Sequence, residues 1–149
     1  CRSAPAEEGF DISNCRVLLA EDHPTNQKVV QIILQSVGID PVIVENGALA
    51  IERLRHERFD VVLMDMQMPE LDGLSATALL REHERAHDLD RTPVVMLTAN
   101  ALDEHVRASH DAGADLHLSK PIRASALIQT IVDLISRRAR EEERRRGAA

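Results

Sequence analysis

The 149-residue chain has almost no aromatic side chains: it contains two phenylalanines and neither tryptophan nor tyrosine. A hydrophobic core must therefore be built from Val, Ile, Leu, Ala and Met. The scarcity argues against nucleic-acid readers that stack bases on aromatic side chains. The net charge of −7 argues the same way, because phosphate contacts need a positive surface. We therefore expect no nucleic-acid partner.

Cysteines and long apolar runs are also scarce. Cys1 and Cys15 form neither a CxxC pair nor a disulfide framework, which fits a reducing compartment. No apolar run approaches the ~20 residues of a membrane span, and no signal peptide is visible. We expect a cytoplasmic domain without membrane contact of its own. Because the chain begins at Cys1 rather than at Met, we interpret it as a piece of a longer protein or a processed chain.

The composition, 44% hydrophobic and 29% charged, is that of an ordinary globular domain. Residues 1–14 carry Pro5, Gly9 and small or acidic side chains, which indicates a linker. Residues 15–137 form the predicted domain. Residues 138–149 are rich in Arg and Glu, and we expect either a charged tail or the end of the last helix.

Five short apolar runs, bounded by charged residues or proline, divide this domain. They are residues 17–20, 42–44, 61–64, 94–97 and 116–118. Continuous apolar runs without alternation are typical of strands buried on both faces.

Helical periodicity fills the segments that follow these runs. The apolar stripes are, in order, Val29, Val30, Ile33, Leu34 and Val37; Ala48, Ile51 and Leu54; Leu74, Ala78, Leu79 and Leu80; Leu102 and Val106; and Leu127, Ile128, Ile131, Leu134 and Ile135. Gly38 is expected to stop the first helix. The alternation predicts one α/β domain, a doubly wound (βα)5 fold whose parallel five-stranded sheet carries helices on both faces.

Polar side chains follow the predicted strands at their carboxyl ends, where such folds bind ligands. Glu21 and Asp22 follow the first strand and Asp65 the third, while Thr98 and Lys120 follow the fourth and fifth. Three close carboxylates require a compensating cation or raised pKa values. Oxygen ligands of this kind suit Mg²⁺. Phosphoryl transfer needs such neutralising charge, and a carboxylate can be its nucleophile.

Four motifs, in this order, resemble the receiver domains of two-component signalling, particularly those attached to hybrid sensor histidine kinases. They are LLAEDHPTNQ at 18–27, MDMQMPELDG at 64–73, LTANA at 97–101 with AGAD at 112–115, and SKPI at 119–122. The resemblance covers about residues 16–136. It implies the strand order 2-1-3-4-5. It also implies a domain that is no enzyme beyond assisting its own phosphotransfer and slow dephosphorylation, in a parent chain that is a histidine protein kinase, which can itself be membrane-attached.

The resemblance assigns roles to the polar residues at the strand ends. Asp65 would accept a phosphoryl group from a phosphohistidine, and its oxygens would be contacted by Thr98 and Lys120. The donor would be the dimerisation and phosphoacceptor domain of a histidine kinase or a histidine phosphotransfer protein. A cis peptide bond would precede Pro121.

The resemblance also implies a metal site. Asp22 and Asp65 would ligate Mg²⁺ directly, together with the backbone carbonyl of Gln67, and Glu21 would act through a bound water. Taken singly, these residues have plainer explanations: Asp22 could cap the first helix and Asp65 could stand in a turn. Their joint occurrence in this order favours the site.

Two further residues are expected to act in signalling. His117 stands where many relatives carry Tyr or Phe. The resemblance implies that the side chain at this position turns inward when Thr98 moves toward the phosphoryl group. We therefore expect output that is weaker, pH-sensitive or carried by another surface. On the first helix, Ile32 lies outside the apolar face, and we hypothesise that it helps dock a helical phosphodonor.

Other functions fit less well. Phosphohydrolases of the haloacid dehalogenase type place a second Asp where this chain has Gln67. A pseudo-receiver, a docking module that is never phosphorylated and regulates a histidine kinase, is the main alternative. A regulator with a DNA-binding output would need a longer segment after Ser136. Residues 83–87 match the zinc-protease motif HExxH, which we interpret as a solvated, charged turn.

Overall fold

The computed structural model describes residues 15–66, 68, 71–99 and 103–148. Strands and helices alternate within these residues, in the order β1 (Val17–Ala20), α1 (Pro24–Gln35), β2 (Val42–Val44), α2 (Gly47–His56), β3 (Val61–Asp65), α3 (Gly73–Ala86), β4 (Val94–Thr98), α4 (Asp103–Ala112), β5 (Leu116–Ser119) and α5 (Ala124–Ala148). All the predicted strands are present. Asp65, Thr98 and Ser119 extend the last three by one residue each at the carboxyl end.

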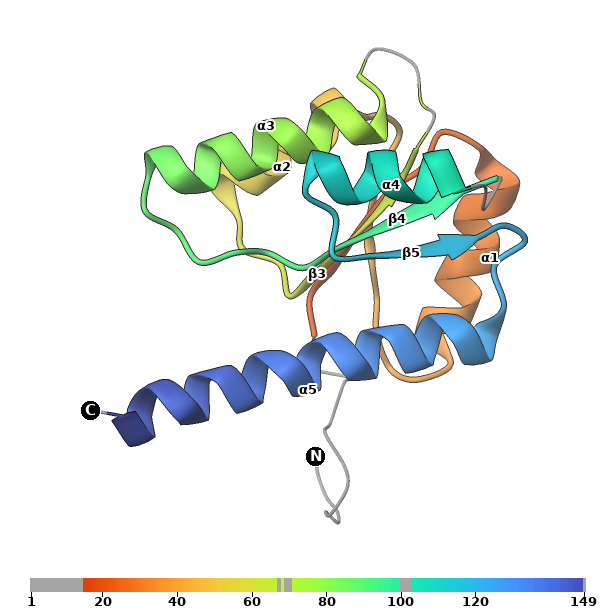
Figure 1. Cartoon of the computed structure of the whole chain (residues 1–149). Coiled ribbons are helices and arrows are strands. Elements are labelled where there is room, and N and C mark those ends of the chain that lie inside the picture. The colour runs from red at the N-terminus through yellow and green to blue at the C-terminus, as the bar shows by residue number, and fades with distance from the viewer. Residues whose placement is uncertain (1–14, 67, 69–70, 100–102, 149) are drawn as a thin grey trace.

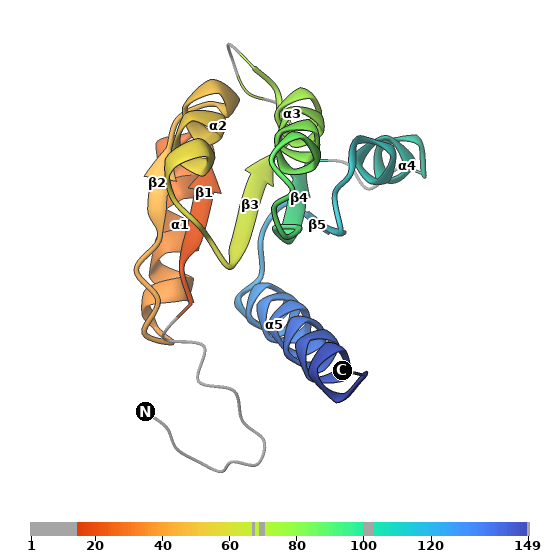
Figure 2. The same ribbon diagram turned by 90° about the vertical axis from the view of Figure 1, so that its left-hand side faces the viewer.

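The strands form one parallel sheet in the order β2-β1-β3-β4-β5, as the resemblance implies. Helices α1 and α5 cover one face of this sheet, while α2, α3 and α4 lie on the other (Figures 1 and 2). Each crossover from strand to parallel strand passes through a helix, which is the arrangement expected of a doubly wound fold.

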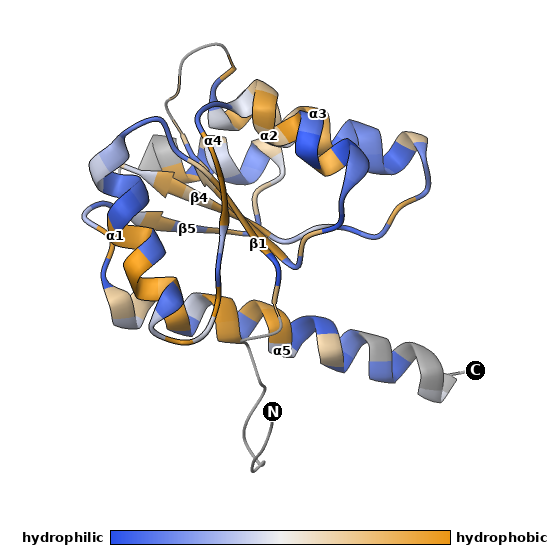
Figure 3. Ribbon diagram, turned by 180° about the vertical axis from the view of Figure 1, so that it is seen from behind, coloured by the Kyte–Doolittle hydropathy of each residue, from blue (hydrophilic) through white to orange (hydrophobic). Residues whose placement is uncertain are grey.

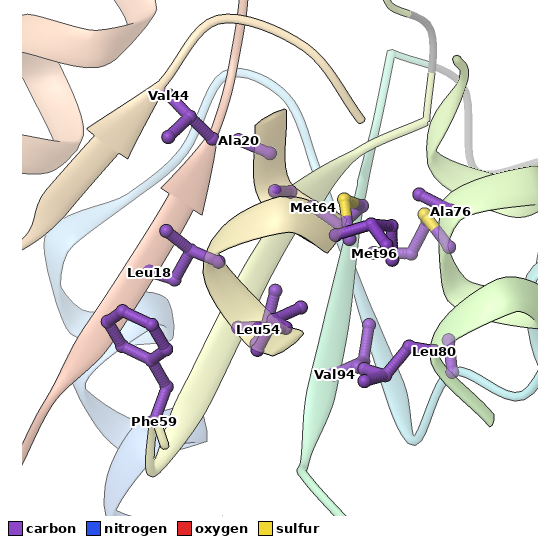
Figure 4. Packing of buried hydrophobic residues seen from close by; sticks show 14 of the residues in the cluster. Leu18, Ala20, Val44, Leu54, Phe59, Met64, Ala76, Leu80, Val94 and Met96 are labelled. Carbon is purple, nitrogen blue, oxygen red and sulfur yellow. The ribbon is translucent and has the colours of Figure 1, made fainter. Parts of the chain in front are cut away.

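Successive side chains of the central strands enter two separate cores, because Cβ atoms alternate across a sheet. Leu18, Val62, Met64, Val94 and Met96 pack toward α2 and α3 (Figure 4). On the other face, Val17, Leu19, Leu63, Val95 and Leu97 pack toward α1 and α5. Because both faces are covered, the strands are mainly apolar, as the orange colour at the centre of Figure 3 shows.

Several predicted helix faces are wrong in detail. Ala48, Ala78 and Leu79 are exposed, and so is Val29 on α1. The buried positions are held by small residues instead, Ala50 on α2 and Ala76 on α3. A β-carbon at Gly47 would lie 3.1 Å from that of Ala76, so α2 and α3 approach closely here. Leu102, also expected to face the core, lies outside the described residues.

Three of the described helix ends illustrate the effect of the local sequence. Asp72 caps α3, since its side chain accepts a hydrogen bond from Ser75 N at 2.7 Å. Gly38 follows α1 with φ of 87°, a conformation that favours glycine. His23, at the start of α1, makes no side-chain capping bond. Helix α5 continues through the Arg- and Glu-rich segment to Ala148, and within the described part of the chain no helix is long and apolar enough to cross a membrane.

A buried ionic network lies at the amino ends of β4 and β5. Arg81 on α3 donates to Glu84 Oε1 at 2.9 Å, to Asp115 Oδ2 at 3.0 Å, to Thr92 O at 2.8 Å and to Gly113 O at 2.9 Å. The side chains of Arg81 and Glu84 are each 7% exposed. The interpretation of residues 83–87 as a solvated turn is therefore wrong for Glu84, which is folded inward by Arg81.

Candidate functional site

The predicted site residues converge at the carboxyl end of the sheet. Backbone hydrogen bonds continue the ladder past the strands: Met66 N donates to Leu97 O at 2.8 Å, and Lys120 N donates to Thr98 O at 2.7 Å. These bonds place Asp65 and Lys120 beside the end of β4. The parallel register therefore brings together residues that are distant in sequence.

Three carboxylates and one ammonium form the centre of the site. One ligand oxygen from each of Glu21, Asp22 and Asp65 lies within 4.8 Å of the others. Lys120 Nζ lies 3.1 Å from Asp65 Oδ1 and 3.2 Å from Glu21 Oε1. Glu21 and Asp65 are buried, whereas Asp22 is accessible to solvent. One lysine offsets only part of this negative charge.

The electrostatics of the cluster appear in the pKa values of its members. Burial and then the charge of Glu21 raise the pKa of Asp65 from 3.8 to about 6, although Lys120 acts in the opposite direction. Burial disfavours the charged ammonium of Lys120, but the hydrogen bond and charge of Asp65, followed by Glu21, outweigh it and raise the pKa of Lys120. The folded site thus resists a second buried carboxylate charge.

The donor set fits a hard divalent cation. Carboxylate oxygens are the ligands that Mg²⁺ prefers. Glu21 Oε1 is buried and accepts no hydrogen bond among the described residues, although the Lys120 ammonium lies 3.2 Å away. A cation beside Asp22 and Asp65 would relieve the repulsion that raises the pKa of Asp65. The expected carbonyl ligand, Gln67, lies outside the described residues.

The turn between β3 and α3 is held tightly behind Asp65. Gly73 N donates to Met66 O at 3.0 Å, and a β-carbon at Gly73 would collide with the carbonyl oxygen of Asp65. At the start of α2, Gly47 N donates to Leu71 O at 3.1 Å. Glycine is required at both positions by close backbone contact, so two helix starts fix the path of the chain beside the site.

The remaining predicted residues surround this cluster. The peptide bond between Lys120 and Pro121 is cis, as the resemblance implies. His117 is half-buried on β5, opposite Met96. Ile32 is 58% exposed on α1, next to the 38% exposed Val29.

Comparison with known proteins defines the class. Residues 17–132 match the family model described as the response regulator receiver domain. The chain is 39% identical over 117 residues to the sensor protein GacS of Pseudomonas syringae pv. syringae. The matched region covers 78% of this chain and 13% of that protein. The chain thus spans about an eighth of that relative, and it matches hybrid histidine kinases from Dictyostelium discoideum as well.

Solved structures give the same result. The receiver domain of sensor histidine kinase PA1611 from Pseudomonas aeruginosa PAO1, with a magnesium ion in its active-site cleft, has 35% identity and a TM-score of 0.74, covering 82% of this chain and 98% of that one. The Saccharomyces cerevisiae complex of the histidine phosphotransfer protein Ypd1 with the Ssk1 receiver domain matches at 26% identity and a TM-score of 0.74, covering 78% and 86%.

The fold and the family model together identify a two-component signalling module. The chain belongs to the response regulator receiver domain family, and its relatives are the receiver domains of hybrid sensor histidine kinases.

Proposed function

We propose that this domain accepts a phosphoryl group on Asp65 from a phosphohistidine, with Mg²⁺ as cofactor, and so relays or gates a two-component signal. The observation that carries the proposal is the cluster of Glu21, Asp22 and Asp65 around Lys120 at the carboxyl end of the sheet. Thr98 ends the neighbouring strand. The magnesium-bound receiver of PA1611 supports the choice of cation.

Each residue has a defined task in this transfer. An Asp65 carboxylate oxygen attacks phosphorus as the bond to the donor imidazole nitrogen breaks, and the donor keeps that electron pair. Lys120 then neutralises phosphoryl oxygen charge, and the Thr98 hydroxyl donates to another oxygen. Asp22 and Asp65, together with the Gln67 carbonyl and with Glu21 through a water, would hold Mg²⁺, which would supply further charge neutralisation.

The test is phosphorylation by a small donor. The domain is incubated with Mg²⁺ and acetyl phosphate, and its intact mass is measured promptly. We expect one phosphoryl adduct on the wild type and none on Asp65→Asn or in the presence of EDTA. Asp40→Asn is the control, because Asp40 is exposed and lies outside the acidic cluster, and it should be labelled like the wild type. Absence of an adduct, together with an NMR spectrum that beryllofluoride leaves unchanged, would replace this proposal by the pseudo-receiver alternative.

The proposed partner is a helical phosphodonor, either the phosphoacceptor domain of a histidine kinase or a histidine phosphotransfer protein. The yeast complex of Ypd1 with a receiver domain supports this kind of partner. We further propose that the parent chain is a histidine kinase, because the relatives include histidine kinases, and that it is cytoplasmic or membrane-attached with this domain on the cytoplasmic side.

Ile32 provides a prediction about this docking. Ile32→Glu is expected to slow phosphoryl transfer from phosphorylated Ypd1 about 10-fold, because a charge would replace apolar contact area. Leu79→Glu, at an exposed leucine on the opposite face of the sheet, should leave the rate unchanged. Labelling by acetyl phosphate should be the same in all three proteins. Equal transfer rates for the two variants would remove Ile32 from the docking surface.

A further inference from the structure

The end of β1 is anchored by side chains that reach back from α1. Gln27 Nε2 donates to the carbonyl oxygen of Glu21 at 2.6 Å, and Asn26 Nδ2 lies 3.5 Å from Glu21 Oε2. The same Oε2 accepts from His23 N at 3.1 Å. Glu21 N in turn donates to Val44 O at 3.0 Å. The backbone N–H, the backbone carbonyl and Oε2 of this buried glutamate are therefore all held by neighbours.

These hydrogen bonds lie at a helix start that has no side-chain cap. The His23 side chain makes no capping bond, and Pro24 occupies the first turn of α1. The carboxylate of Glu21 instead accepts a hydrogen bond from the backbone amide of His23, the residue at the capping position. The side chain of Gln27, one turn into the helix, donates a hydrogen bond back to the Glu21 carbonyl. The start of α1 and the end of β1 are consequently held as one unit.

The position of this turn matters because Asp22 follows Glu21 directly. The Glu21 carbonyl belongs to the peptide unit that joins the two acidic residues. A hydrogen bond to it orients that unit and hence the two carboxylates relative to Asp65. Outer partners of this kind tune metal affinity without touching the metal.

We propose that Gln27 is a positioning residue that sets the Mg²⁺ affinity of the acidic cluster by holding the Glu21 carbonyl, with Asn26 as its auxiliary. The inference rests on the proposed function, because it assumes that the cluster is a magnesium site. The side chain of Gln27 is bound to the Glu21 carbonyl and is not one of the groups proposed to hold the metal or the phosphoryl oxygens. It therefore acts on the metal equilibrium and not on the transfer step.

The experiment compares Gln27→Met, which keeps the length of the side chain and removes its donor, with Gln35→Met, the same change at an exposed position of α1. Isothermal titration calorimetry gives the Mg²⁺ Kd of each protein. We expect a Kd about 10-fold higher for Gln27→Met and an unchanged value for Gln35→Met. Gln27→Ala, which adds no apolar bulk and suits a helix, should behave like Gln27→Met and replaces it if that variant fails to fold.

Phosphorylation by acetyl phosphate supplies the second measurement. The Mg²⁺ concentration for half-maximal labelling should rise by the same factor, while the rate at saturating Mg²⁺ stays within about 2-fold of wild type. A lower saturating rate with an unchanged Kd, or equal Kd values for the Gln27 and Gln35 variants, would overturn the inference. Calorimetry needs no phosphoryl donor, so a wild type that binds Mg²⁺ but takes no phosphoryl group would refute only the proposed function.

Discussion

Replacing Arg81 by alanine is expected to lower the free energy of unfolding by about 3–5 kcal/mol, because the change leaves the buried carboxylate of Glu84 without its cation and removes one of the two arginines that pair with Asp115. Arg81 binds Glu84 and Asp115 with a side chain that is 7% exposed. Its other donors serve two backbone carbonyls, those of Thr92 and Gly113. The loss would thus loosen α3, the start of β4 and the turn before β5 together. Urea denaturation at neutral pH measures the effect.

The control is Arg85→Ala, one turn further along α3 at an exposed position. Its effect should stay within about 0.5 kcal/mol. Arg81→Lys keeps the charge but not the fork of donors, so an intermediate loss is expected. Because a buried ion pair can be replaced by apolar groups at little cost, Arg81→Met combined with Glu84→Leu should recover part of the lost stability. A loss for Arg81→Ala no larger than that for Arg85→Ala would show that the network adds nothing.

The central part of the fold is readable from sequence for a specific reason. A parallel sheet covered on both faces turns each strand into a continuous apolar run, and the runs at residues 61–65 and 94–98 are entirely buried. Their carboxyl ends must then meet at one edge. The position of Glu21, Asp65 and Lys120 after strands is therefore enough to predict that they lie together.

The Arg81 network was missed because its partners are remote in sequence. Arg81 and Glu84 form a helical pair that is common on solvated helix surfaces. What buries them is Asp115 and the carbonyl of Gly113, which lie 34 and 32 residues further along the chain. Hydrophobic periodicity reports the face that apolar side chains choose. It carries no information on a charged side chain that is drawn inward by distant polar groups.

The wrongly predicted faces of α2 and α3 are explained by small residues. The buried side of α2 and α3 depends on Gly47, Ala50 and Ala76, because the two helices lie too close for larger side chains. Leucine and alanine at neighbouring positions gave an apolar stripe rotated toward Leu79, which is 40% exposed. The position proposed for Gln27 could not be predicted from the sequence either. The one signal was a helix start with a poor capping residue, His23, followed by polar side chains in the first turn.

Asp65→Asn is expected to stabilise the metal-free domain by about 2–3 kcal/mol at pH 7.5. The pKa of Asp65 is raised from 3.8 to about 6, mainly by burial and then by Glu21. The folded protein therefore binds this proton more tightly than the unfolded chain does. The resulting stability is fully present below pH 3.8 and is lost as the pH rises through about 6. Asparagine has no proton to lose, so its advantage should grow across this window.

The measurement is the free energy of unfolding in urea from pH 4 to 7.5, with EDTA, for wild type and Asp65→Asn. A difference in unfolding free energy between the two proteins that does not change with pH would show that ionisation of Asp65 does not destabilise the folded domain. Repeating the series with Mg²⁺ adds a second constraint, because a ligand that binds only the folded state stabilises it. Mg²⁺ should then stabilise the wild type more than Asp65→Asn and narrow the gap at pH 7.5, since the cation compensates the charge that asparagine removes. The burial and repulsion that disfavour the charge of Asp65 without a cation would in this way contribute to the affinity of the site for Mg²⁺.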